Sequence, residues 1–229
     1  MCEIRKFQVF GHRCSGTNAL IKTLERNLPD LRFTEENGFK HWLVPPEQAI
    51  PDDTMTVVIA REVSQWLRSL HRKPWHVRPK LKSLAFPDFI RAPWDTVWDE
   101  DFWGVDQTDQ RYGQPIAEER CPRTGRPFAN AVAMRTAKLA NWLAVCNRSV
   151  AALLVNHAVL VSDPRSIVLQ CAELSGMSAA SPFEPVTTYK GDSAKSFRPK
   201  RYPPLDSQDR SHVANFLDPE LERAFGFDA

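Results

Sequence analysis

The chain has 229 residues, a formal net charge of +2 and 42% hydrophobic residues, which suits a single domain, residues 1–229, with an ordinary core. The balanced charge excludes a uniformly basic surface for nucleic acid or membrane, so an anion site must come from a local cluster of basic residues. The five cysteines form no C-x-x-C pair and no apolar run is long enough for a leader or a membrane span, so we expect a cytoplasmic protein without disulfides or structural zinc.

The first half of the chain predicts strands that alternate with helices. Ile4–Phe10 and Met55–Ala60 are rich in β-forming residues, and the second run is apolar throughout, which is typical of a strand buried on both faces. Thr17–Asn27 and Glu62–Arg72 carry apolar residues at helical spacing. This alternation predicts an α/β protein with a parallel sheet.

The second half is predicted to continue the same pattern. A long helix is expected over Ala129–Val155 and a buried strand over His157–Ser162. Asp163-Pro164 has the form of an N-cap followed by proline at the first helical position, so a further helix should begin there and end before Gly176.

Residues 86–128 interrupt the pattern. Trp94, Trp98 and Trp103 stand there among many Pro, Gly and Asp residues. We expect an insertion with little regular structure, which could stack on a sugar or an apolar ring or could form the small core of a lid.

The strongest local feature is a glycine-rich loop between the first strand and the first helix. It reads Gly11-His12-Arg13-Cys14-Ser15-Gly16-Thr17-Asn18, and backbone N–H groups in such a loop can surround an anionic group. The spacing matches the phosphate-loop pattern G-x-x-x-x-G-K-[ST], but Thr17 replaces the lysine that a nucleoside triphosphatase needs. The pattern therefore indicates a phosphate site that is not built for ATP; an ordinary strand-to-helix turn is the alternative.

The segment GHRCSGTNAL resembles the 5′-phosphosulfate loop of sulfotransferases that use 3′-phosphoadenosine 5′-phosphosulfate (PAPS). The resemblance implies a three-layer parallel sheet of the P-loop nucleotide-binding type, with PAPS as co-substrate and PAP as product. It implies donor contacts from Arg13, Cys14, Ser15, Gly16, Thr17 and Asn18. The family usually has Lys or Arg directly before the serine, whereas this chain has Cys14 there and Arg13 one position earlier.

Two further segments resemble the same family, in the same order. Arg61 follows the second strand and Ser69 lies eight residues later, the spacing at which the family binds the 3′-phosphate of PAPS. Downstream, Tyr189-Lys190-Gly191-Asp192 resembles the family's R-K-G-x-x-G motif, so Lys190 and Gly191 would contact the same phosphate. The second glycine of that motif is missing here, and Tyr189 replaces its arginine.

His41 is the candidate general base, because it lies between the loop and Arg61, where the family usually carries its catalytic histidine. A histidine suits this role because its pKa lies near neutral pH. Lys40 could supply a cation for the leaving phosphate, together with Arg13. An exposed histidine on a strand edge is the alternative, and His12, Glu35 and Glu36 are the other candidate bases.

The remaining candidates surround this core of the site. His71 and His76 should line the pocket or pack beside it, and Arg135 and Lys138 share a helix face with Trp142. That face could bind an anion, although a solvated helix face is the simpler interpretation. We expect no metal ion, because no cluster has metal-ligand spacing.

The sequence therefore predicts an enzyme that transfers a sulfuryl group from PAPS to a small-molecule or glycan acceptor bound on the side of the insertion. Two alternatives stay open. One is a phosphotransferase with a degenerate loop, and the other is a nucleotide-binding module that does not transfer a sulfuryl group.

Overall fold

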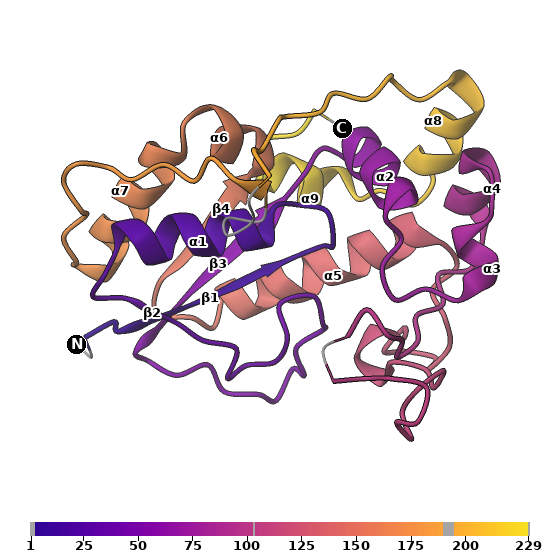
Figure 1. The fold of residues 1–229 in the computed structure, drawn as a ribbon, viewed down its shortest axis with the longest axis horizontal. Coiled ribbons are helices and arrows are strands. Elements are labelled where there is room, and N and C mark those ends of the chain that lie inside the picture. Colours follow the sequence, from indigo (N-terminus) through magenta and orange to yellow (C-terminus); the bar gives the residue numbers. More distant parts are fainter. Residues whose placement is uncertain (1–2, 103, 190–194, 229) are drawn as a thin grey trace.

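In the computed structural model, which describes residues 3–102, 104–189 and 195–228, four parallel strands form one sheet (Figure 1). The strands are β1 (Lys6–Gly11), β2 (Arg32–Phe33), β3 (Thr54–Ala60) and β4 (Ala152–Asn156), in the order β2-β1-β3-β4. The predicted α/β class with a parallel sheet is confirmed. The two predicted strands of the first half are β1 and β3, and every residue of β3 is buried.

Side chains of the central strands alternate between two apolar clusters, one on each face of the sheet. On one face, Phe7 and Val9 pack with α1 (Thr17–Asn27), α6 (His157–Ser162) and α7 (Pro164–Ser175). On the other face, Phe10 and Val58 pack with α5 (Ala131–Cys146) and with the segment after α9 (Pro219–Ala224). Helices thus cover both faces of the sheet.

A third apolar cluster lies beyond the sheet and contains the buried residues Trp66 and Trp94. It joins α5 to four short helices: α2 (Val63–Arg72), α3 (Pro79–Lys82), α4 (Phe86–Arg91) and α8 (Ser207–Ala214). Glu62 caps α2, because its carboxylate accepts hydrogen bonds from the N–H groups of Ser64 and Gln65.

The prediction was wrong around β4. The expected helix over Ala129–Val155 ends at Cys146, and β4 follows after a turn. The expected strand over His157–Ser162 is helix α6, which begins where the Asn156 side chain accepts a hydrogen bond from the N–H of Ala158. A six-residue apolar run fits a strand and a short helix equally well, and here the N-cap at Asn156 favours the helix.

The segment 86–128 has little regular structure beyond α4 and the 3₁₀ turn η1 (Ala117–Glu119), largely as expected. Trp94 packs against Phe89, and Trp98 packs against Trp42 and Phe102, so these tryptophans serve as a small core. Trp103 lies outside the described residues. Within the described ranges, no helix combines the length and the apolar character that crossing a membrane requires.

Candidate functional site

The sheet order creates a crevice between β1 and β3. The chain leaves β1 toward β2 on one side and leaves β3 toward β4 on the other, and the pairing places Gly11 beside Ile59. At such a reversal the two loops separate at the carboxyl ends of the strands, which is where open α/β sheets bind ligands.

A cleft of about 1680 Å³ lies at this edge. Among the described residues, nine lysines or arginines line it but only two acidic residues, Glu62 and Asp101. The basic residues are Arg13, Lys40, Arg61, Arg72, Lys73, Lys195, Arg198, Lys200 and Arg201. The chain as a whole has 30 basic and 28 acidic residues, so the excess of basic over acidic residues in the cleft is not apparent from the composition. Such a cleft attracts an anion.

The predicted phosphate loop forms the floor of this cleft. A side chain at Gly11 would lie 2.7 Å from the Ile59 carbonyl oxygen, so only glycine fits where the loop leaves β1. Cys14 and Gly16 have positive φ angles of 66° and 95°, and α1 begins directly after Gly16. Backbone turned in this way directs N–H groups to one side, as anion-binding loops do.

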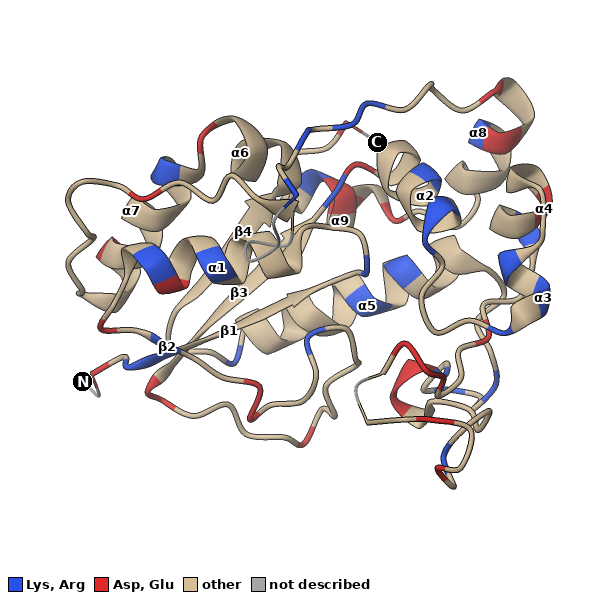
Figure 2. Cartoon of the chain, viewed as in Figure 1, with Lys and Arg blue, Asp and Glu red and all other residues tan. Residues whose placement is uncertain are grey.

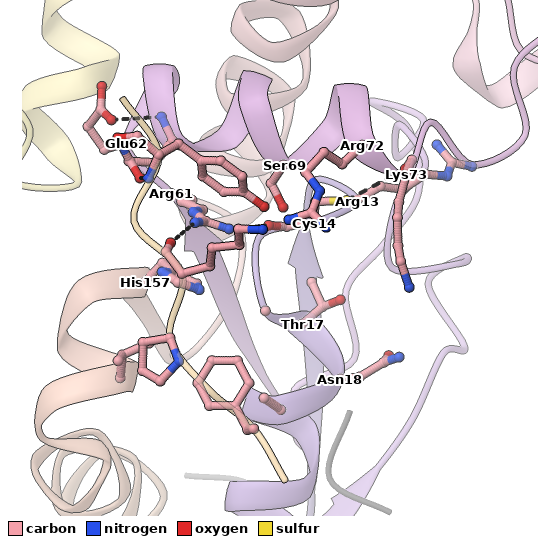
Figure 3. Close-up of a pocket in the computed structure, with 18 of the residues that line it drawn as sticks. Arg13, Cys14, Thr17, Asn18, Arg61, Glu62, Ser69, Arg72, Lys73 and His157 are labelled. Carbon is pink, nitrogen blue, oxygen red and sulfur yellow. Dashed lines mark hydrogen bonds between the residues drawn. The ribbon is translucent and has the colours of Figure 1, made fainter. Parts of the chain in front are cut away.

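Arg61 and Ser69 meet at Cys14, although they are more than two helical turns apart in sequence (Figure 3). Arg61 lies at the end of β3 and donates to the Cys14 carbonyl oxygen at 3.4 Å. Burial raises the pKa of the Cys14 thiol, and a hydrogen bond with Ser69 and the charge of Arg61 oppose this rise. Arg61 and Ser69, which the resemblance assigns to the same phosphate, therefore both contact Cys14.

Of the other loop residues, Arg13, Gly16, Thr17 and Asn18 also line the cleft. Ser15 is fully buried, and its hydroxyl donates to the His12 carbonyl oxygen at 2.6 Å. The predicted contacts from Lys190 and Gly191 lie outside the described residues.

A basic segment that the sequence analysis missed crosses the cleft. Residues 195–204 run past the first turn of α2 as an extended strap, on which Figure 2 shows a series of basic positions. The Gln65 side chain pairs with both the N–H and the carbonyl of Tyr202, and Arg61 donates to the Lys200 carbonyl oxygen. The repeated basic residues of Lys195–Tyr202 were the available signal, but no periodic element marks this segment.

His41 lies in the turn region after β2 and lines the cleft, so it is not on a strand edge. Its Nδ1 donates to the Gly11 carbonyl oxygen at 2.6 Å, because a carbonyl can only accept. Burial, with the charges of Arg13 and Lys40, holds the pKa of His41 well below its usual value. The ring is therefore neutral near pH 7 with Nε2 unprotonated, but its pKa lies below the near-neutral value expected from the sequence, which makes it a weaker base.

The other candidate bases are placed less well. His12 is buried between Trp66 and Trp142, and its Nε2 donates to the Arg135 carbonyl oxygen at 3.2 Å. The Glu35 and Glu36 carboxylates form ion pairs with Lys40 and Lys6, at 3.3 and 3.0 Å. These three candidates are not part of the cleft lining as the described residues form it, whereas Lys40 is.

Arg135 and Lys138 are neither solvated nor in the cleft lining, so both interpretations of that helix face were wrong. Arg135 is fully buried and its Nη2 lies 2.7 Å from a Glu222 carboxylate oxygen. Lys138 is 1% exposed and pairs with Glu119, a buried residue of η1. Packing against the C-terminal helix and the insertion covers this face.

His71 packs between Phe86 and Phe89, whereas His76 lines the cleft and lies 2.7 Å from Asp99. The side chains of His76, Asp99 and Asp101 come close enough together to hold a metal ion. Lys82 lies 3.4 and 3.7 Å from the two carboxylates. This lysine already balances part of their charge.

The fold and the cleft together define an α/β protein with a basic cleft at the carboxyl ends of a parallel sheet. No family model, curated protein or solved structure matches the chain.

Proposed function

We propose that this protein is a sulfotransferase of the three-layer P-loop nucleotide-binding type, which uses PAPS as its sulfuryl donor. The observation that carries the proposal is the pair of cationic positions in one cleft: the loop of residues 13–18, and Arg61 with Ser69 beside it. PAPS has two separate anionic groups, and we assign its 5′-phosphosulfate to the loop and its 3′-phosphate to Arg61 and Ser69.

The loop favours a sulfated nucleotide over ATP. Thr17 stands where a triphosphatase needs a lysine to neutralise the γ-phosphate. Arg61 and the strap offer cations next to the loop, where a 3′-phosphate would bind. Arg61 donates to main-chain carbonyls at 3.3–3.4 Å, and a phosphate would replace these long contacts with charge-assisted ones.

Sulfuryl transfer then follows from the side chains around the loop. The acceptor oxygen or nitrogen attacks sulfur, the bond from sulfur to the 5′-phosphate oxygen breaks, and PAP leaves with the electron pair of that bond. The acceptor proton passes to Nε2 of His41, whose Nδ1 is held by Gly11. Arg13 and Lys40 stabilise the negative charge that develops between donor and acceptor.

The cleft has room for an acceptor as well as the donor, because about 1680 Å³ exceeds the usual 300–1,000 Å³ of a single-ligand pocket. Phe39 and Trp75 line it together with His41. Such rings suit a small molecule or a glycan that offers a flat apolar face.

A melting comparison of ligands tests the donor. PAP should stabilise the protein by about 2.7 kcal/mol at a hundredfold excess over its dissociation constant. At the same concentration, ATP with magnesium and AMP should stabilise the protein less, because neither offers both anionic groups in the required places. Equal stabilisation by ATP with magnesium and PAP would contradict the proposal and favour a phosphotransferase.

Arg61→Ala provides the matching variant. It should weaken PAP binding about tenfold or more, since a charge-assisted hydrogen bond is worth about 1.5–3 kcal/mol. Arg165→Ala is the control, because Arg165 is exposed on α7 outside the lining described for the cleft. A screen for sulfated products with PAPS completes the test, and PAP binding without turnover would indicate a nucleotide-binding module instead.

A further inference from the structure

Glu119 connects the insertion to the centre of the cleft. It is fully buried in η1, and both of its carboxylate oxygens accept hydrogen bonds from Nη1 of Arg13, at 2.6 and 2.8 Å. Nζ of Lys138 donates to the same carboxylate. We propose that Glu119 is a positioning residue. It orients the Arg13 guanidinium so that two of its N–H groups, here called the Arg13 fork, can bind oxygens of the transferred group. Through Lys138 it also connects this fork to His41.

The state of the Arg13 side chain supports this role. Arg13 lines the cleft and is only 6% exposed. Its Nη1 is bound to Glu119, whereas its Nε and Nη2 have no hydrogen-bond partner among the described residues. These two nitrogens form one edge of the planar guanidinium, the edge that binds two oxygens of a phosphate or sulfate group. A buried edge without a partner points to a ligand that supplies those oxygens.

Lys138 extends the same network to the candidate base. Its Nζ donates to the His41 carbonyl oxygen at 2.5 Å, and the His41 ring donates to the carbonyl of Gly11, where the loop begins. One carboxylate therefore holds both the fork and, through one lysine, the main chain of the base. Such a shell of buried hydrogen bonds maintains the geometry that catalysis needs.

The three side chains of this network carry a net positive charge, which a bound anion would balance. Arg13 and Lys138 bring two positive charges to one buried carboxylate. Burial opposes ionisation of Glu119, yet the two cations hold the pKa of its carboxyl well below the ordinary value. One positive charge stays uncompensated next to the phosphate loop, and a bound oxyanion would balance it.

This inference rests on the proposed function for the identity of the transferred group, and it makes a distinct claim. PAP lacks the sulfuryl group that the fork would bind, and Glu119→Gln leaves the charge of Arg13 in the loop, so this variant should affect turnover much more than PAP binding. Glu119→Gln keeps the side-chain volume and removes the charge. We expect turnover of PAPS to fall about a hundredfold, the effect typical of losing one oxyanion donor, while PAP affinity changes less than about threefold.

Glu118→Gln is the matched control, because Glu118 is the exposed neighbour in the same turn and loses the same charge. It should keep wild-type turnover and melting temperature. The double variant Glu119→Gln/Lys138→Met removes one negative and one positive charge, so the buried net charge is unchanged. We expect it to recover much of the melting temperature that Glu119→Gln loses, but not the turnover. Recovery of both together would make Glu119 a purely structural residue and overturn the proposal.

A second measurement uses sulfate alone as the probe and does not depend on PAPS being the donor. The Nε–H resonance of Arg13, assigned by its loss in Arg13→Lys, should shift on adding sulfate in the wild type and in Glu118→Gln. In Glu119→Gln it should broaden and shift little. If the wild type turns over no PAPS, the proposed function fails and this measurement still decides the role of Glu119. Equal sulfate shifts in Glu119→Gln and the wild type would overturn it.

Discussion

Two of the histidines near the cleft hydrogen-bond to main-chain carbonyls, but their rings lie in different surroundings. His12 packs between two tryptophans, and its Nδ1 is buried with no partner among the described residues. His41 donates from Nδ1 to Gly11 and lines the cleft. Burial lowers the pKa of both rings, so both are neutral near pH 7. Of these two histidines, His41 is the one whose neutral ring belongs to the lining described for the cleft.

Replacement of His41 by asparagine should separate binding from chemistry. The amide of His41→Asn can still donate to the Gly11 carbonyl, so the loop and PAP affinity should stay near wild type. Turnover should fall about 10²–10⁴-fold, because no group accepts the acceptor proton. Calorimetry with PAP and a turnover assay with PAPS measure the two quantities.

His212→Gln is the control for this substitution, because Nε2 of His212 bonds the Ile90 carbonyl outside the cleft lining that the structure describes. It should leave turnover unchanged. Wild-type turnover in His41→Asn would show that the base is another group, and Glu35, Glu36 and His12 would then be tested in that order.

At the scale of the element, the start of α1 depends on one glycine. Gly16 precedes the helix with a φ of 95°, and no side chain caps the first turn. A methyl group at this position would lie 3.0 Å from Cδ2 of His157, the first residue of α6. The loop after β1 and the start of α6 therefore meet at a position where glycine is required.

Gly16→Ala should destabilise the fold and weaken PAP binding. The positive φ costs an alanine about 1–3 kcal/mol, and crowding against His157 adds to this cost. Gly176→Ala is the control, since Gly176 ends α7 with a φ of 70° and has open space around it. Both variants should lower the urea midpoint, but only Gly16→Ala should lower PAP affinity. Equal effects of the two on PAP binding would contradict this account of the loop.

Elements with their own local signals could be predicted from the sequence. Thr17–Asn27 is α1, and the cap-and-proline pair at Asp163-Pro164 opens α7 as expected. The region around β4 could not be predicted correctly, because a short apolar run does not distinguish a strand from a helix. The side chain of Asn156 ends the strand and begins α6, and that small polar signal was outweighed by the apolar residues after it.

The site itself could be predicted only in part, for a reason that applies to the whole molecule. The loop and Arg61 each follow a predicted strand, and the order of the sheet brings them together; His41 was chosen only by its position between them in the sequence. Glu119 lies 106 residues from Arg13, in a segment without periodicity, and only tertiary packing places it there. The use of PAPS without a metal ion and the small-molecule or glycan acceptor remain predictions.

Acid should destabilise the whole molecule before its carboxylates titrate. Burial lowers the pKa of His12, His41, His76 and His157, the last to about 4. Each folded pKa lies below the unfolded value near 6.5, so the unfolded chain binds more protons between the two values. Stability should therefore be complete above pH 7 and fall as the pH drops below 6.5, by up to about 1.4 kcal/mol per pH unit for each histidine.

Urea unfolding at pH 7, 6 and 5 measures this slope. His157→Gln should reduce it by about one histidine's share, with PAP left out so that ligand binding does not contribute. The carboxyl of Glu222, whose pKa burial raises, acts in the opposite direction and makes the slope smaller. A free energy of unfolding that does not change between pH 7 and pH 5 would contradict the neutral, buried state of these rings.

The attachment of Glu119 also limits how the protein can be re-engineered. Residues 86–128, an irregular segment between α2 and α5, are an obvious segment to exchange if the proposed acceptor specificity is to be changed. Its removal would also take away the carboxylate between Arg13 and Lys138 and leave two buried cations facing each other. A chimera with a foreign insertion therefore has to carry an acidic residue at the equivalent of Glu119, or to replace Lys138 by a neutral side chain at the same time.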